Sequence, residues 1–168
     1  MLGIVLSVSI VLLVVLLDQI SKLLVLAYMY EGHVVLIKGV LNFTYVENRG
    51  MAFGMLADHR WMFIVLSVVG IGLMGFYLFR YVKNWLPRVG LGLIVGGGIG
   101  NMIDRIRLGY VVDFIDFCAF DFWVWVFNIA DAAVCVGAAL FVLSVLLDMI
   151  AEGKRAKCEK AAQQKTED

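Results

Sequence analysis

The chain has 168 residues, of which 62% are hydrophobic and only 17% are charged, and it contains a single proline. This composition is typical of an integral membrane protein, and the length suits one domain. The formal net charge is zero and no basic run stands out apart from a short tail, so we expect no nucleic-acid partner.

The first apolar run extends from residue 2 to residue 30 and is interrupted only by the segment DQISK. A helix through it is about 40 Å long, enough to cross a ~30 Å hydrocarbon core with tilt, so we expect a span over about 4–28. A cleaved signal peptide is disfavoured because no basic n-region and no small-residue cleavage site are present. Asp18 and Lys22 share a helix face and form either an internal ion pair or a polar post that orients substrate or a catalytic group.

The longest polar connection covers residues 29–60. Residues 34–37 and 40–46 are typical of short strands joined by a tight turn at Lys38 and Gly39, which predicts a small sheet on the membrane surface. Residues 48–54 then place polar and glycine residues just before the next apolar run. That segment is either a simple turn or a turn that touches a ligand.

Residues 61–79 carry no charge, so we expect a second span over about 61–80. Three basic residues follow it closely: Arg80, Lys83 and Arg88. The positive-inside rule places this short loop in the cytoplasm. The first span must then begin in the cytoplasm, and the segment 29–60 must lie outside.

The third span is expected over about 86–105 and contains the sequence GGGIGNMIDR. Gly96 and Gly100 form a GxxxG pattern, which favours close helix packing, whereas a phosphate-binding loop would need GxxxxGK[ST] after a strand. Three polar side chains at the outer end of this span can line a pocket: Asn101, Asp104 and Arg105.

A fourth span is expected over 127–150, and basic residues in the tail, 151–168, return the chain to the cytoplasm. The tail itself is predicted to be solvated and frayed at its end. The sequence therefore predicts an all-α integral membrane protein of four transmembrane helices in one domain over 1–168. Its outer segments are 29–60 and 106–126, with a small extracytoplasmic β-sheet between helices 1 and 2. This topology brings the polar residues of the spans to one level near the outer leaflet.

Four carboxylates lie in the otherwise apolar stretch from residue 109 to 131: Asp113, Asp116, Asp121 and Asp131. Carboxylates beside lipid are energetically expensive and usually mark a function. Asp116 either supports a neighbouring acid or is a solvated bystander. Four aromatic residues before the last span form either an interfacial belt or a lid over a site: Phe120, Phe122, Trp123 and Trp125.

The sequence lacks the residue patterns that several other kinds of site require. No serine is adjacent to a histidine, His33 and His59 have the pattern of solvated loop residues, and Cys118, Cys135 and Cys158 have no CxxC or Cys/His spacing. We therefore expect no serine nucleophile, disulfide framework, metal site or cofactor.

A pair of carboxylates remains. If Asp113 and Asp131 face each other they can share one proton, because like charges about 3 Å apart cannot both ionise easily. The ionised carboxylate would draw a proton from water as the water attacks a carbonyl, while the protonated one donates to the oxyanion. On the residues alone, this aspartyl peptidase mechanism competes with a small transporter or channel that uses the same acids as an ion relay.

Five blocks occur in order along the chain: DQISK, ENRGMAF, GGGIGNMIDR, VVDFIDF and FNIAD. In order, spacing and four-span topology the chain resembles the lipoprotein signal peptidase (signal peptidase II) family, bacterial inner-membrane aspartyl peptidases of prolipoprotein processing. The resemblance covers nearly the whole chain. One departure is Met51, which stands where the family commonly has alanine and which affects local packing rather than catalysis.

The resemblance implies that Asp113 and Asp131 are the catalytic pair. It implies substrate-binding or supporting roles for Asp18, Lys22, Asn48, Gly50, Asn101, Arg105 and Asn128. The implied substrate is a prolipoprotein whose cysteine carries diacylglycerol, cut just before that cysteine. No metal or cofactor is implied. We expect a monomer among membrane lipids, and the positive-inside rule predicts cytoplasmic termini and an active site towards the outer leaflet.

The competing classes make different predictions. A transporter or channel should show an internal repeat and a water path through both leaflets, but no repeat is visible and the polar residues cluster at one end. A structural assembly subunit would leave Asp113 and Asp131 at the membrane surface without a task.

Overall fold

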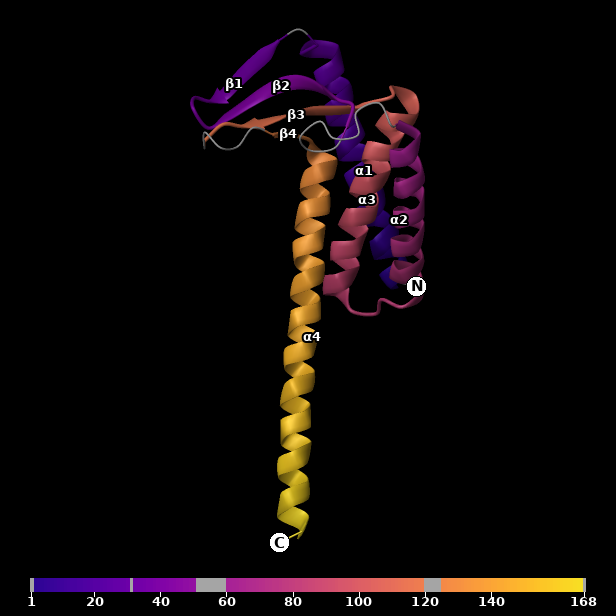
Figure 1. Ribbon diagram of the computed structural model, residues 1–168, viewed down its shortest axis with the longest axis vertical. Helices are drawn as coiled ribbons and strands as arrows, with labels where there is room; N and C mark the ends of the chain where they lie inside the picture. The colour runs from indigo at the N-terminus through magenta and orange to yellow at the C-terminus, as the bar shows by residue number, and fades with distance from the viewer. Residues whose placement is uncertain (1, 31, 51–59, 120–124, 168) are drawn as a thin grey trace.

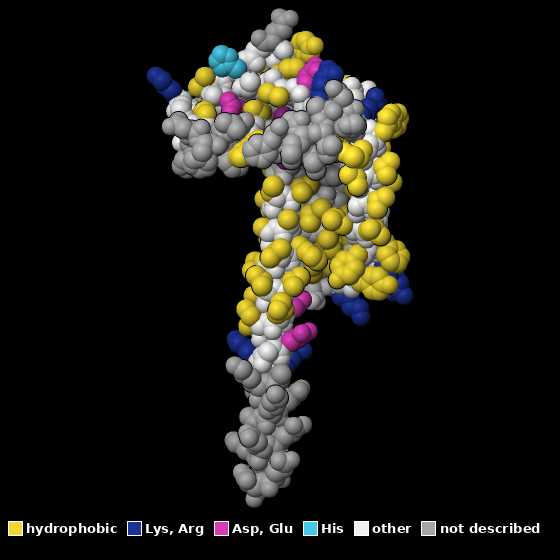
Figure 2. All heavy atoms as spheres, in the orientation of Figure 1, with side chains coloured by type: hydrophobic (Ala, Val, Ile, Leu, Met, Phe, Trp, Pro, Cys, Tyr) yellow, Lys and Arg dark blue, Asp and Glu magenta, His cyan; other side chains and the backbone are white. Residues whose placement is uncertain are grey.

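The computed structural model describes residues 2–30, 32–50, 60–119 and 125–167. Its helices are α1 (Leu2–Tyr28), α2 (Arg60–Arg80), α3 (Trp85–Arg107) and α4 (Ile129–Glu167). Its strands are β1 (His33–Ile37), β2 (Leu41–Asn48), β3 (Val111–Phe117) and β4 (Val126–Phe127). Each helix is long and apolar enough to cross a membrane, and apolar side chains gather along the face of the bundle seen in Figure 2. The predicted four-helix membrane architecture is confirmed.

Helix α3 contacts each of the other three helices (Figure 1). Its glycines make this possible, since a Cβ atom on Gly96 would lie 2.8 Å from Cβ of Val14 in α1. A Cβ atom on Gly97 would collide with the carbonyl oxygen of Ala130 in α4. The packing role predicted for the GxxxG pattern is confirmed, and the glycines bring α1 and α4 against α3.

The four strands form one antiparallel sheet in the order β1-β2-β3-β4, which lies across one end of the bundle (Figure 1). The two strands expected from the first outer segment are present as β1 and β2. No strand was predicted in the second outer segment, but Val111–Phe117 form β3 there. Alternate residues Val112 and Phe114 face a core with Val25 of α1, and this burial stabilises the strand.

The register of the sheet places one acid beside an amide. Val46 pairs with Asp113 and Asn48 pairs with Val111, so Asn48 and Asp113 are diagonal neighbours on one face. Gly109, with φ of 90°, makes the turn from α3 into β3. Strand β4 then delivers the chain directly to the start of α4.

The ends of α4 differ from the expected span. The helix begins at Ile129 because Val126 and Phe127 pair with Asp116 and Ile115 of β3. It continues to Glu167 instead of ending at residue 150 with a frayed tail. Some residues named in the sequence analysis lie outside the described ones: Met51, His59, Phe120, Asp121, Phe122, Trp123 and the side chain of Cys158.

Candidate active site

Asp113 lies in the middle of β3 with only 2% of its surface exposed. Two asparagine side chains donate to its carboxylate: Nδ2 of Asn48 to Oδ2 at 2.8 Å and Nδ2 of Asn128 to Oδ1 at 2.6 Å. Oδ1 of Asn48 accepts the backbone N–H of the buried residue Gly50 at 3.1 Å. The turn at Gly50 therefore fixes which end of the Asn48 amide faces Asp113.

Asp131 is held in the first turn of α4 by a reciprocal cap. Oδ1 of Asn128, the residue before the helix, accepts the backbone N–H of Asp131 at 2.9 Å. Oδ2 of Asp131 accepts the backbone N–H of Asn128 at 3.3 Å. This is a capping box with aspartate in the position usually taken by glutamate or glutamine. The spacing Asn-Ile-Ala-Asp is a sequence signal for it.

Asn101 of α3 connects the acids to a buried cation. Its Nδ2 donates to Oδ1 of Asp131 at 2.8 Å, while its Oδ1 accepts from Lys22 at 2.9 Å and from Asn128 at 3.1 Å. Because an ammonium group can only donate, Lys22 fixes the orientation of the Asn101 amide. The donor side of that amide therefore faces Asp131.

Lys22 is the centre of a buried ion cluster. Its Nζ atom lies 2.9 Å from Asp18 and 2.9 Å from Asp104, and all three side chains are almost completely inaccessible. Oδ1 of Asp18 accepts the backbone N–H of Ala130 at 3.0 Å, and Oδ2 of Asp104 accepts that of Val112 at 3.1 Å. The cluster thus hydrogen-bonds the backbone of the residue just before Asp131 and of the residue just before Asp113. Asp18 and Lys22 were expected to form either an internal ion pair or a polar post. The ion pair forms, and both residues also position neighbours of the acids through Ala130 and Asn101.

Gln19 and Asp104 belong to this network, but only Asp104 was singled out in the sequence, as a residue that can line a pocket at the outer end of the third span. Nε2 of Gln19 donates to Oδ1 of Asp104 at 2.9 Å and to the carbonyl of Gly100 at 3.2 Å. Asp104 was visible in the GGGIGNMIDR block, but its role depends on β3, which was not predicted. Nothing in the local sequence around Gln19 points to a contact with α3.

Arg105 and Asp116 lie at the edge of the network. Nη1 of Arg105 donates to the backbone carbonyl of Asn101 at 3.4 Å, and its guanidinium lies 5.1 Å from the centre of the Phe63 ring. Asp116 accepts from Asn42 at 3.4 Å, away from the two central acids. The expectation that the polar residues of the three spans meet at one level is confirmed by these contacts.

Burial, together with the nearby charge of Asp131, raises the pKa of Asp113 to about 7. The hydrogen bonds from Asn48 and Asn128 act in the opposite direction, because they stabilise the ionised carboxylate. Asp113 can therefore carry a proton near neutral pH. Within the described parts of the chain, no three His, Cys, Asp or Glu side chains cluster as metal ligands would.

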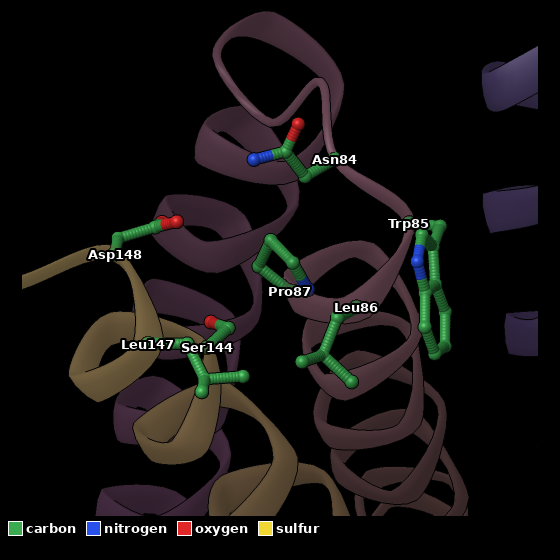
Figure 3. Close-up of a pocket in the computed structure, with 7 residues that line it drawn as sticks. All are labelled: Asn84, Trp85, Leu86, Pro87, Ser144, Leu147 and Asp148. Carbon is green, nitrogen blue, oxygen red and sulfur yellow. The ribbon is translucent and has the colours of Figure 1, made fainter. Parts of the chain in front are cut away.

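Two apolar hollows flank the acids. One, of about 340 Å³, adjoins Asp131 and is lined by Trp125, Phe127, Ala132 and Cys135. Another, of about 430 Å³, lies between α1, the sheet and the start of α4. A hollow of about 280 Å³ between the start of α3 and Ser144, Leu147 and Asp148 of α4 shares no lining residue with the acid network (Figure 3).

The fold and the site define a polytopic membrane protein with two carboxylates on a shared amide network at one end of its helical bundle. The sequence model of the family described as "Signal peptidase (SPase) II" matches residues 10–147. The chain therefore belongs to the signal peptidase II family and is a membrane-embedded peptidase. Family membership favours a peptidase over the transporter considered from the sequence.

The chain is similar to several bacterial proteins named lipoprotein signal peptidase. It is 47% identical to the protein of Halothermothrix orenii over 136 residues, which is 80% of this chain and 90% of that one. It is 41% identical to the protein of Clostridioides difficile over 142 residues, 84% of this chain and 95% of that one.

Two solved structures share the fold. A bacterial membrane enzyme determined by the in meso method at 2.3 Å matches with a TM-score of 0.80 at 30% identity, over 85% of this chain and 88% of that one. A bacterial membrane enzyme determined in the same way at 1.9 Å matches with a TM-score of 0.77 at 30% identity, over 83% and 92%.

Proposed function

We propose that the chain is an aspartic endopeptidase that removes the signal peptide from diacylglyceryl-modified prolipoproteins, cutting just before the lipidated cysteine. The names of its relatives support the prolipoprotein substrate. The observation that carries the catalytic assignment is that Asn128 donates to both carboxylates, through its side-chain Nδ2 to Asp113 and through its backbone N–H to Asp131. Asn48 and Asn101 complete that network and serve as supporting residues.

In the proposed reaction Asp113 begins protonated and Asp131 begins ionised, consistent with the raised pKa of Asp113. Asp131 takes a proton from water as the water oxygen attacks the scissile carbonyl, and Asp113 gives its proton to the developing oxyanion. The tetrahedral intermediate then collapses. The C–N bond breaks, the amine of the lipidated cysteine leaves with the proton from Asp131, and the hydroxyl proton returns to Asp113. No metal or cofactor takes part in this scheme.

The position of the acids suits a substrate that arrives within the bilayer. Asp131 lies in the first turn of α4, so a cleavage site next to it lies at the end of the apolar spans. An apolar signal helix can lie along the bundle, while the hollow beside Asp131 offers an apolar surface to the lipidated residue.

The proposal includes an orientation in the bacterial inner membrane. Both termini and the loop with Arg80 and Lys83 lie in the cytoplasm, and the sheet and the acids lie on the outer side. Labelling of His33→Cys and Lys154→Cys variants of a cysteine-free background with an impermeant maleimide tests this. In intact spheroplasts only the His33→Cys protein should react. We also propose that the enzyme acts as a monomer, which light scattering of the purified protein can check.

Asparagine substitution of each acid tests the mechanism, and Asp116→Asn is a matched control on the same strand. Purified Asp113→Asn and Asp131→Asn enzymes should lose at least about a hundredfold in cleavage of a lipidated prolipoprotein, because general acid–base catalysis alone contributes about 10²–10⁴. Asp116→Asn should retain cleavage, since Asp116 bonds to Asn42 rather than to the pair. Full activity in either of the first two variants would sink the aspartic assignment.

A further inference from the structure

The apolar hollow beside Asp131 lies between the sheet and the outer surface of α4. Trp125 and Phe127 of the strand region form one wall, and Ala132 and Cys135 of α4 form the other. Both walls come from the junction of β4 and α4, so the hollow is a recess at the start of α4, next to the sheet that lies across this end of the bundle (Figure 1).

The exposed lining of this recess is apolar. Asp131 is the charged residue among the described residues that line it, but its carboxylate oxygens accept from the side chain of Asn101 and from the backbone N–H of Asn128. Cys135 is exposed, one helical turn after Asp131, so the recess continues along the surface of α4 away from the acids. A ligand that fits must therefore present an apolar chain to this recess, which begins beside Asp131.

Side-chain size along α4 gives the recess its shape. Small residues, Ala132 and Cys135, line it near the acids, whereas large residues such as Leu143 and Leu146 are exposed further along the helix. The volume of about 340 Å³ is roughly twice that of an apolar cavity, ~150 Å³, that holds benzene. It has room for part of one hydrocarbon chain.

We propose that this recess binds one acyl chain of the diacylglyceryl group on the substrate cysteine, and that Cys135 is a specificity-determining residue for the chain. The inference rests on the proposed function. A lipidated cysteine at the scissile bond presents a polar glyceryl thioether next to Asp131 and a chain that runs into the recess beside Cys135.

Binding in the recess orients the substrate more than it increases affinity. Lipid tails are as apolar as the walls of the recess, so transfer from bilayer to protein gains little from the hydrophobic effect. A chain fixed between Phe127 and Cys135 instead aligns the neighbouring carbonyl with the acids, and small misalignments have large effects on rate. The recess should therefore act on kcat as well as on KM.

Filling the recess tests the proposal. Cys135→Trp should lower kcat/KM for a palmitoyl-bearing prolipoprotein by about tenfold or more, in the range typical of lost contacts in an apolar pocket, and should affect a butyryl-bearing substrate much less. Val136→Trp is the matched control, because Val136 is 53% exposed on the same helix but does not line the recess. An equal loss on both substrates, or no loss on either, would overturn the proposal.

A second measurement avoids reliance on the fold of the tryptophan variant. In an Asp131→Asn protein with Cys118→Ser and Cys158→Ser, the remaining thiol at Cys135 is alkylated with N-ethylmaleimide. The palmitoyl substrate should slow alkylation, and the butyryl substrate should not. Equal alkylation rates with both substrates would contradict the inference. The proposed function is judged separately, by whether the wild-type enzyme cleaves the palmitoyl substrate and Asp131→Asn does not.

Discussion

The side-chain amide of Asn128 lies 2.6 Å from Oδ1 of Asp113. The same residue caps α4 by accepting the backbone N–H of Asp131 at 2.9 Å. One side chain therefore sets the distance between an acid on a strand and an acid on a helix. Asn128, which lies between β4 and α4, therefore fixes the position of the sheet relative to the helical bundle at the site.

Replacement of Asn128 by alanine should remove both contacts. We expect activity to fall by about 10²–10³, the effect of losing one well-placed polar group in a preorganised site. Loss of the helix cap should lower stability by only about 0.5–2 kcal/mol. Asn42→Ala is a matched control, because Asn42 donates to Asp116 instead. Cleavage assays and thermal unfolding of the Asn128→Ala and Asn42→Ala proteins test this prediction. Equal activities of the two variants would contradict it.

The raised pKa of Asp113 gives a pH dependence with a definite sign. If Asp113 must hold a proton, activity is present below its pKa of about 7 and is lost as the pH rises through that value. Asn48 donates to the ionised carboxylate and so lowers this pKa. Asn48→Ala should therefore move the falling limb of kcat against pH to higher pH. Arg49→Ala should leave the limb in place, and a shift to lower pH in Asn48→Ala would refute the argument.

Much of this architecture could be predicted because hydropathy identifies membrane spans directly. The two central acids could also be predicted, since Asp113 and Asp131 lie in apolar surroundings and in blocks that resemble a known family. Strand β3 was missed because Asp113 and Asp116 are three residues apart, which breaks simple alternation. The role of Gln19 depends on a contact with Asp104, 85 residues away. Such partners follow from helix packing, which a single sequence does not specify.

The buried cluster around Lys22 predicts a large loss of stability from one substitution. Lys22→Met leaves Asp18 and Asp104 without their counter-charge, and breaking a buried pair in this way costs about 3–5 kcal/mol. Adding Asp104→Asn should restore part of the loss, because it removes one of the stranded charges. The exposed pair of Arg49 and Glu47 provides the control, where Arg49→Ala should cost at most about 1 kcal/mol. Similar losses in Lys22→Met and Arg49→Ala, measured by thermal unfolding, would contradict the prediction.

The contact between α3 and α4 at Gly97 couples packing to the site. A methyl group at Gly97 would collide with the carbonyl of Ala130 and lie 2.9 Å from Cγ2 of Val134. Gly97→Ala should therefore push α4 outwards, cost about 1–3 kcal/mol, and reduce activity by separating Asn101 from Asp131, now 2.8 Å apart.

Gly70 of α2 provides the comparison for Gly97, because a Cβ atom there would meet nothing within 4 Å. Gly70→Ala should be neutral or stabilise the helix by up to about 1 kcal/mol, since alanine favours a helix more than glycine does. The test is to measure the activity and the unfolding temperature of the Gly97→Ala and Gly70→Ala proteins. If Gly97→Ala matches Gly70→Ala in both, the close approach of α3 and α4 is not what holds Asp131 against Asn101.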